Sequence, residues 1–135
     1  MTKRILVVDD EPSVTDGMAR LLRKDGFAVE AAANGFEALR RFRTDPPDLV
    51  ITDVLMPMKE GVSLVIELRQ LDPDIPIIVI SGGGRARFME FLDIAARAGA
   101  TATFQKPVPV GELRRAIRDC FQAAPARPAP VGGRA

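Results

Sequence analysis

Six polar residues that could take part in chemistry stand at the ends of short apolar runs. They are Asp9, Asp10, Glu11, Asp53, Ser81 and Lys106. In an open parallel sheet the carboxyl ends of the strands meet at one edge, and ligands bind in the crevice beyond it. If each apolar run is a strand of such a sheet, all six side chains converge on one crevice.

The carboxylates in this group would repel one another strongly, so the cluster must hold protons, splay apart or bind a cation. Two like charges about 4 Å apart repel by roughly 4 kcal/mol at an effective dielectric constant near 20. The chain contains no histidine, and a set of carboxylate oxygens favours Mg²⁺, or Mn²⁺ in its place, with water and a phosphate oxygen as further ligands. We therefore expect a magnesium site at this edge.

Asp53 is the residue that we expect to do covalent chemistry. A carboxylate can attack phosphorus to give an aspartyl phosphate. Lys106 can meet one phosphoryl oxygen with its charge, and Ser81 can meet another with its hydroxyl, so that positioning and electrostatics stabilise the transferred group. The sequence thus predicts Asp53 as a phosphoacceptor, with Ser81 and Lys106 as its catalytic partners.

Each of these residues also has a purely structural interpretation. Asp10 could cap a following helix, and Asp53 could begin a turn. Ser81 precedes three glycines and could be an ordinary loop residue, and Lys106 could end a strand with its side chain in solvent. All four would have to be structural on the same sheet edge, so we favour the chemical interpretation.

The apolar runs alternate with segments of helical period. We expect strands at 5–8, 27–31, 49–52, 77–80 and 101–105, and helices at 11–25, at 35–43, after Pro57, after Gly84 and at 110–121. Strands that are apolar throughout are typical of a parallel sheet covered on both faces. The predicted fold class is α/β, a doubly wound five-stranded parallel sheet with helices on both faces.

Helical spacing assigns a buried face to each predicted helix. The residues expected on these faces are Val14, Met18, Leu21, Leu22, Phe36, Leu39, Phe42, Val62, Val65, Leu68, Phe88, Phe91, Leu92, Ala95, Val110, Leu113, Ile117, Cys120 and Phe121. Cys120 lies on such a face, so we interpret it as a buried structural residue and not as a reactive thiol.

Length and charge limit the possible functions. The chain of 135 residues is long enough for one domain with a core. Residues 1–122 hold 17 basic and 18 acidic residues, a net charge of −1, and Arg127 and Arg134 bring the whole chain to +1. This balance gives no reason to expect nucleic acid or a membrane as a partner. One cysteine and no long apolar segment favour a cytoplasmic protein.

Composition changes near the end of the chain. Residues 123–135 are rich in proline and alanine and have no hydrophobic period, which is typical of a disordered tail. We therefore expect one domain at 1–122 followed by this tail.

Several short motifs together carry a family resemblance. They are Val7-Val8-Asp9-Asp10-Glu11, the run 48–53 followed by Met56-Pro57 and Gly61, then Ser81, Ala98-Gly99-Ala100 and Lys106-Pro107. In this order they resemble the receiver domain of bacterial two-component response regulators. The resemblance implies the flavodoxin-like strand order 2-1-3-4-5 and a stand-alone signalling domain similar to the chemotaxis regulators.

The resemblance also implies roles for individual residues. Asp53 would accept the phosphoryl group from a sensor histidine kinase or a histidine phosphotransfer protein. Asp9, Asp10, Asp53 and the backbone carbonyl of Leu55 would hold Mg²⁺, and the peptide bond between Lys106 and Pro107 would be cis. The surface around the helix after Gly84, the strand at 101–105 and the last helix would contact an unknown downstream protein, and the chain would be a monomer or a weak dimer.

Departures from the family pattern concern how the signal is read out. Thr103 stands where many relatives carry Tyr or Phe, and Phe104 should point into the core by strand alternation. The segment after Ser81 looks longer than in many relatives, so we expect reordering of residues 82–90 to carry the signal.

Two other function classes fit part of the pattern. A Mg²⁺-dependent phosphatase with an aspartyl intermediate would need a second Asp two residues after Asp53, where this chain has Leu55. A receiver-like interaction module that acts without phosphorylation would be expected to lack an acidic residue or the lysine, and this chain lacks neither. Leu55 and Gly83 also replace polar side chains that often position hydrolytic water in relatives, which predicts slow self-dephosphorylation.

Overall fold

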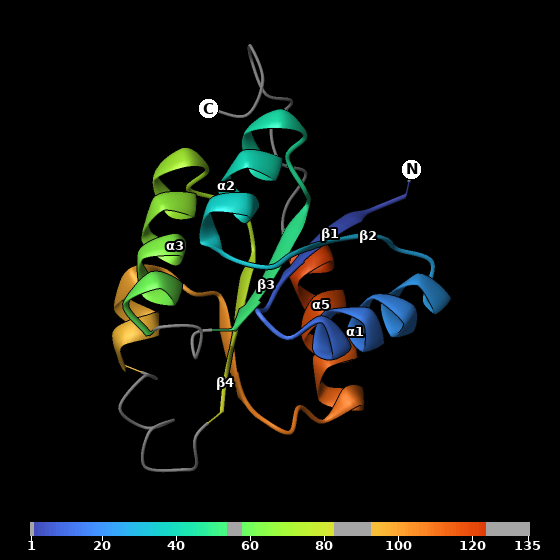
Figure 1. Ribbon diagram of the computed structural model, residues 1–135. Helices are drawn as coiled ribbons and strands as arrows, with labels where there is room; N and C mark the ends of the chain where they lie inside the picture. Colours follow the sequence, from blue (N-terminus) through green and yellow to red (C-terminus); the bar gives the residue numbers. More distant parts are fainter. Residues whose placement is uncertain (1, 54–57, 83–92, 124–135) are drawn as a thin grey trace.

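A twisted sheet with helices on both of its faces is the framework of the chain (Figure 1). The computed structural model describes residues 2–53, 58–82 and 93–123. The strands are β1 (Arg4–Val8), β2 (Ala28–Ala32), β3 (Leu49–Asp53), β4 (Ile77–Ser81) and β5 (Ala102–Gln105). The helices are α1 (Pro12–Lys24), α2 (Gly35–Thr44), α3 (Met58–Leu71) and α5 (Val110–Ala123), and residues 93–98 are also helical.

The sheet has the order β2-β1-β3-β4-β5, and every pair of neighbouring strands is parallel. Both the doubly wound parallel sheet and its order were predicted, and both are confirmed. The ends of these elements lie within one or two residues of the predicted ones. Because all five strands run in one direction, their carboxyl ends share one edge of the sheet.

Alternating residues of the strands feed two separate cores. One core joins α1 and α5 to one face of the sheet and contains Ile5, Val7, Ala19, Leu22, Val29, Leu49, Ile51, Ile78, Ile80, Leu113 and Ile117. The other joins α2 and α3 to the opposite face and contains Leu6, Val8, Ala32, Ala38, Leu39, Phe42, Val50, Leu64, Val65, Leu68, Ile75, Ile77, Val79 and Ala95. β3 and β4 are buried along their whole length, so the strand ends that carry polar residues start from a rigid base.

Helix ends show how the chain leaves the sheet edge. Glu11 is the N-cap of α1 and its side chain makes no capping hydrogen bond, while Pro12 occupies the first turn. The structural interpretation of Asp10 as a helix cap is therefore wrong. In α2, by contrast, Oδ1 of Asn34 accepts a hydrogen bond of 2.9 Å from the backbone N–H of Glu37, which satisfies one of the unpaired donors of the first turn.

Two residues predicted on buried faces are exposed. The side chain of Phe36 is 83 % exposed and that of Val110 is 45 % exposed. Position 36 lies about 200° around the helix from Ala38, which is fully buried, so Phe36 points away from the sheet. Val110 is the first residue of α5 and lies one turn before Leu113, where burial begins.

Some predicted features lie outside the described residues. They are Leu55, Met56, Pro57, Gly83, Gly84, Phe88, Phe91, Leu92, most of the loop at 82–90 and the tail from residue 124 onward. Among the described helices, none is long and apolar enough to cross a membrane.

Candidate functional site

Four residues named from the sequence end or follow strands at the same edge of the sheet. Asp9 follows β1, Asp53 ends β3, Ser81 ends β4 and Lys106 follows β5. The register places Asp53 opposite Ile80, so Ser81 is one residue further along the neighbouring strand. The backbone N–H of Lys106 donates a 2.8 Å hydrogen bond to the carbonyl of Ser81, which continues the pairing of β4 with β5 beyond the strand end.

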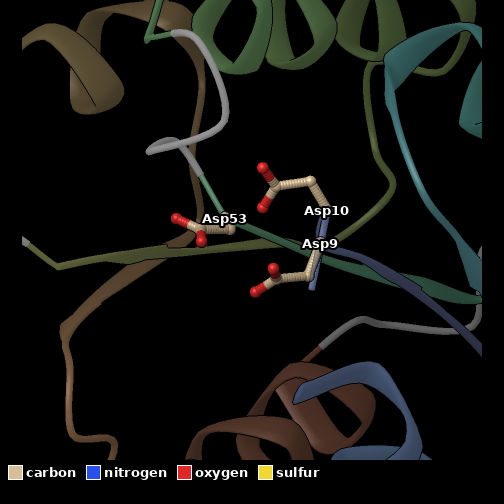
Figure 2. A group of neighbouring side chains, drawn as sticks. All are labelled: Asp9, Asp10 and Asp53. Carbon is tan, nitrogen blue, oxygen red and sulfur yellow. The ribbon is translucent and has the colours of Figure 1, made fainter. Parts of the chain in front are cut away.

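Three carboxylates gather at the centre of this edge. Figure 2 shows Asp9, Asp10 and Asp53 with their carboxylates turned to the same side. One oxygen from each lies within 4.8 Å of one oxygen from each of the others. Asp9 and Asp53 are both only 4 % exposed, whereas Asp10 is exposed. Two buried like charges and a third at the rim therefore create a site that attracts cations.

Lys106 supplies a positive charge to this group of carboxylates. Its Nζ lies 2.7 Å from Oδ2 of Asp53 and 3.3 Å from Oδ2 of Asp9. Burial alone would lower the pKa of Lys106, but the hydrogen bond and charge of Asp53, aided by Asp9, outweigh it and hold the pKa above its ordinary value. The structural interpretation that placed this lysine in solvent is wrong, and the peptide bond between Lys106 and Pro107 is cis, as expected.

Local hydrogen bonds hold the side chain of Asp9 firmly and that of Ser81 weakly. Oδ1 of Asp9 accepts the backbone N–H of Glu11 at 2.9 Å, so the two oxygens of Asp9 have different partners. Ser81 is 2 % exposed, and its hydroxyl donates to the carbonyl of Gly82 at 3.3 Å. This hydrogen bond is long for an O–H donor, so little holds the hydroxyl of Ser81 against turning toward a ligand.

An open hollow lies over the carboxylates and is mostly apolar. Its polar lining comes from Asp10, Glu11, Asp53 and Lys106. The remaining lining residues are Val14, Met18, Ile80, Gly82, Pro107 and Val108. Val14 and Met18 were expected only in the core, because helical period separates an inner from an outer face but does not show where a helix passes over a site. The hollow brings apolar side chains of α1 and of the segment after β5 next to Asp53.

The residues present fit a magnesium ion. Mg²⁺ is usually held by one or two carboxylates together with water and phosphate oxygens, and here one oxygen from each of three carboxylates lies within 4.8 Å of one oxygen from each of the others. All three donors are hard oxygens, and the chain has no histidine that would favour a softer metal. Asp9, Asp10 and Asp53 could hold the ion. Leu55, whose carbonyl was predicted as a further ligand, lies outside the described residues.

Thr103, which stands in the place of the usual aromatic, and Phe104, which was expected in the core, follow the strand alternation. Thr103 is the register partner of Val79 and is partly buried. Phe104 packs against the core shared by α1 and α5, as expected. The position of the usual aromatic is thus occupied by a small hydroxyl side chain, and the neighbouring aromatic is committed to the core.

The sequence matches the Response regulator receiver domain family over residues 5–118. This chain belongs to that family. The match covers every described residue of the site, from Asp9 to Lys106. Receiver domains are signalling domains of two-component systems. The match to this family confirms the resemblance that the sequence motifs indicated.

Named relatives and solved structures agree with this assignment. The chain is 38% identical over 110 residues to the "Transcriptional regulatory protein PrrA" of Mycobacterium tuberculosis, covering 82% of this chain and 46% of the relative. It is 36% identical over 119 residues to the "Response regulator MprA" of Mycobacterium ulcerans, covering 87% and 50%. The structure of a receiver domain protein from Clostridium thermocellum has a TM-score of 0.81 at 31% identity, covering 90% of this chain and 95% of that one.

The receiver domain therefore spans about half the length of the curated relatives that it matches. A CheY-like receiver domain protein from Methanospirillum hungatei has a TM-score of 0.83 at 29% identity and matches over 96% of its own length. The chain thus matches curated relatives about twice its length, one of which is named a transcriptional regulator. It also matches receiver proteins of about its own length. The expectation that this receiver has no nucleic-acid partner accordingly stays a prediction.

Proposed function

We propose that this receiver is the phosphoacceptor of a two-component phosphorelay and that Asp53 takes the phosphoryl group. The observation that carries the proposal is the contact of Lys106 with Asp53 inside a group of three carboxylates. A buried carboxylate held by an ammonium group at the floor of an open hollow can be reached by a phosphorylated side chain. No other described group combines these features.

The donor is a phosphohistidine on a sensor histidine kinase or a histidine phosphotransfer protein. A carboxylate oxygen of Asp53 forms a bond to phosphorus as the bond from phosphorus to the imidazole nitrogen breaks. The imidazole leaves with that electron pair and is neutral once protonated. A bound Mg²⁺ supplies positive charge to the transferred oxygens, and Asp9 and Asp10 are the residues that, with Asp53, would hold it.

Lys106 and Ser81 position the group after transfer. The ammonium of Lys106 already lies within hydrogen-bond distance of Asp53, so a phosphoryl group on that carboxylate brings a new anion next to an existing cation. Ser81 is buried one strand away with a weakly held hydroxyl that can turn to a second phosphoryl oxygen. The acquired negative charge then alters the contacts of this edge and changes partner binding.

A phosphodonor of low molecular weight tests the proposal directly. The protein is incubated with acetyl phosphate and Mg²⁺, and its intact mass is measured. We expect one phosphoryl adduct on the wild type, none on Asp53→Asn, and an unchanged adduct on Asp74→Asn, which makes the same chemical change at an exposed residue before β4. An adduct that survives Asp53→Asn would exclude Asp53 as the acceptor. The absence of any adduct would favour an interaction module that acts without phosphorylation.

A further inference from the structure

An extra residue stands at the start of β5. The backbone N–H of Thr101 donates to the carbonyl of Ile77 at 2.7 Å, and that of Lys106 donates to the carbonyl of Ser81 at 2.8 Å. The two acceptors are four residues apart in the sequence, whereas the two donors are five residues apart. Between these bonds the chain that contains β5 therefore holds one residue more than β4, which is the pattern of a β-bulge.

The bulge lies at Thr101 and not near the lysine. β4 and β5 pair in one unbroken register that ends with Ser81 opposite Gln105. Ser81 accepts from Lys106, the residue after its partner, in keeping with the slanted bonds of a parallel ladder. The same register, continued backward by one residue, places Thr101 opposite Ile77, and here the partner itself is the donor. The ladder is thus regular at the end of β5 and irregular at its start.

The hydroxyl of Thr101 holds the bulge together. Its Oγ1 accepts the N–H of Ile77 at 3.0 Å, so Thr101 binds both backbone groups of one residue of β4. Ile77 is fully buried, and a buried N–H group needs an acceptor. Just before the bulge, the carbonyl of Gly99 accepts Nε and Nη2 of Arg69 at 3.2 Å and 2.7 Å. Side chains therefore fix the place where β5 begins.

Side-chain alternation shows what depends on this place. Phe104 packs against the core that contains Ile51. Lys106 comes two residues after Phe104, and Asp53 comes two residues after Ile51. Because successive side chains of a strand point to opposite faces, the lysine and the aspartate lie on the same face of the sheet. Their contact of 2.7 Å agrees with this.

Loss of the extra residue would turn the wrong side chain toward the site. If β5 were regular from Thr101 onward, Gln105 would donate to Ser81 and take the place of Lys106, because a shift of one residue turns every side chain to the other face. Burial does little to prevent such a shift. β5 is an edge strand of four residues, all of them partly buried, and Phe104 is its one large apolar side chain.

We propose that Thr101 is a positioning residue for Lys106. The bulge and the hydroxyl of Thr101 determine which residues of β5 face which side of the sheet, and this phase puts the lysine beside Asp53. Thr101 lies at the opposite end of β5 from the site and acts through the strand. Its effect on phosphorylation rests on the proposed phosphoacceptor function, whereas its effect on β5 does not.

Hydrogen exchange of backbone amides, resolved by NMR in the full chain, tests how far the influence of Thr101 extends. Thr101→Val keeps the shape of the side chain and removes the acceptor. The N–H of Ile77 loses its partner, and we expect the amide of Lys106, at the other end of β5, to exchange roughly tenfold faster or more. Amides of β1 and β3 serve as the reference for global stability and should change much less. Thr101→Ser retains the acceptor and should keep the protection of the wild type.

Two results of this measurement would overturn the inference. If only Ile77 loses protection, Thr101 caps one N–H group and does not position Lys106. If the amides of β1, β3 and β5 all lose protection equally, Thr101 contributes to stability alone. Thr44→Val is the matched control, because the hydroxyl of Thr44 donates to the carbonyl of Arg40 at 2.9 Å in the last turn of α2. This variant should leave the Lys106 amide unchanged.

Phosphorylation tests whether Thr101 acts through the lysine. With acetyl phosphate and Mg²⁺, and with intact mass as the measure, Thr101→Val should slow formation of the adduct by roughly tenfold or more, because small displacements of a catalytic group are costly. Thr101→Ser should leave the rate unchanged. Lys106→Met should slow the reaction much less in the Thr101→Val background than in the wild type, since the lysine is already displaced there. If the two losses multiply instead, Thr101 acts independently of Lys106 and the inference fails.

Exchange of two neighbouring residues tests the phase of β5 without any change at Thr101. The double variant Gln105→Lys, Lys106→Gln moves the lysine by one residue and so to the other face of the strand. It should form the adduct as slowly as Lys106→Met does. Formation at the wild-type rate would show that a lysine at either position can serve, and the inference would be wrong.

The outcomes distinguish this inference from the proposed function. If no phosphoryl adduct forms on the wild type, the proposed function fails, and exchange of the Lys106 amide in Thr101→Val still decides the role of Thr101. If the adduct forms but that amide keeps its protection in Thr101→Val, the function stands and the inference is rejected.

Discussion

The ammonium of Lys106 lies 2.7 Å from a carboxylate oxygen of Asp53, although β4 separates the strands that carry them. Two strand spacings amount to about 10 Å, so the long side chain of lysine has to reach inward over the end of β4. Together with Asp9, this contact places one positive and two negative charges in a site where both aspartates are nearly inaccessible to solvent.

Removal of the ammonium should destabilise the metal-free protein. Lys106→Met leaves two buried carboxylates without their cation, which we expect to cost about 1–3 kcal/mol of unfolding free energy, because a buried charged group has lost its partner. Mg²⁺ should restore more stability to this variant than to the wild type, since it replaces the lost positive charge. Urea unfolding with and without Mg²⁺ measures both effects. Lys24→Met, at an exposed lysine of α1, is the matched control and should change neither.

Alkaline pH should remove the same stabilisation from the wild type. The pKa of Lys106 is raised in the folded protein above its ordinary value of 10.5. The protonated lysine therefore contributes its full stabilisation below pH 10.5, and this contribution is lost as the pH rises through the higher value of the folded state. Urea unfolding in a metal chelator should show the difference between wild type and Lys106→Met to be constant up to pH 10.5 and to shrink above it. A difference that grows with pH would contradict the assigned ion pair.

The exposed member of the carboxylate group allows the metal to be tested apart from the fold. Asp10 is exposed, so Asp10→Asn should change the unfolding free energy of the metal-free protein by no more than about 0.5 kcal/mol. It should weaken Mg²⁺ or Mn²⁺ binding at least tenfold, because one of three carboxylates is lost. The chain has no tryptophan or tyrosine, so calorimetry with Mg²⁺ or the electron paramagnetic resonance of Mn²⁺ is the suitable measurement. Glu11→Gln neutralises the next exposed acid and should have a much smaller effect.

The sheet and the gathering of Asp9, Asp53, Ser81 and Lys106 at one of its edges could be predicted, because both depend on where strands end. Five predicted strands that alternate with helical segments specify a parallel sheet, and a parallel sheet collects strand ends at one edge. The reach of Lys106 to Asp9 and Asp53 could not be predicted in this way, since it depends on how the chain bends after β5. The hydrogen bonds that Arg69, in the last turn of α3, donates to the carbonyls of Gly99 and Ile75 likewise left no signal in the sequence, because an arginine at such a position usually faces solvent.

Periodicity also fails at helix ends, and Phe36 shows why. Its spacing from Leu39 and Phe42 suggests one apolar face, but neighbouring Ala38 defines the buried side of α2. We expect Phe42→Ala to lower the unfolding free energy by about 3–5 kcal/mol, because it opens a cavity in the core. Phe36→Ala should change it by no more than about 0.5 kcal/mol. Urea unfolding of both variants is the measurement, and a large loss for Phe36→Ala would show that this side chain is buried in solution.

The thiol of Cys120 should be slow to react. It is partly buried against the core shared by α1 and α5, and burial, followed by the charge of Asp119, raises its pKa. Thiolate is the reactive form, so reaction with an aromatic disulfide reagent at mildly alkaline pH should be at least tenfold slower in the folded protein than in urea. Asp119→Asn removes only the smaller cause and should increase the folded-state rate much less than unfolding does. Equal rates in the folded and unfolded protein would mean that Cys120 is open to solvent and that this part of α5 does not pack as described.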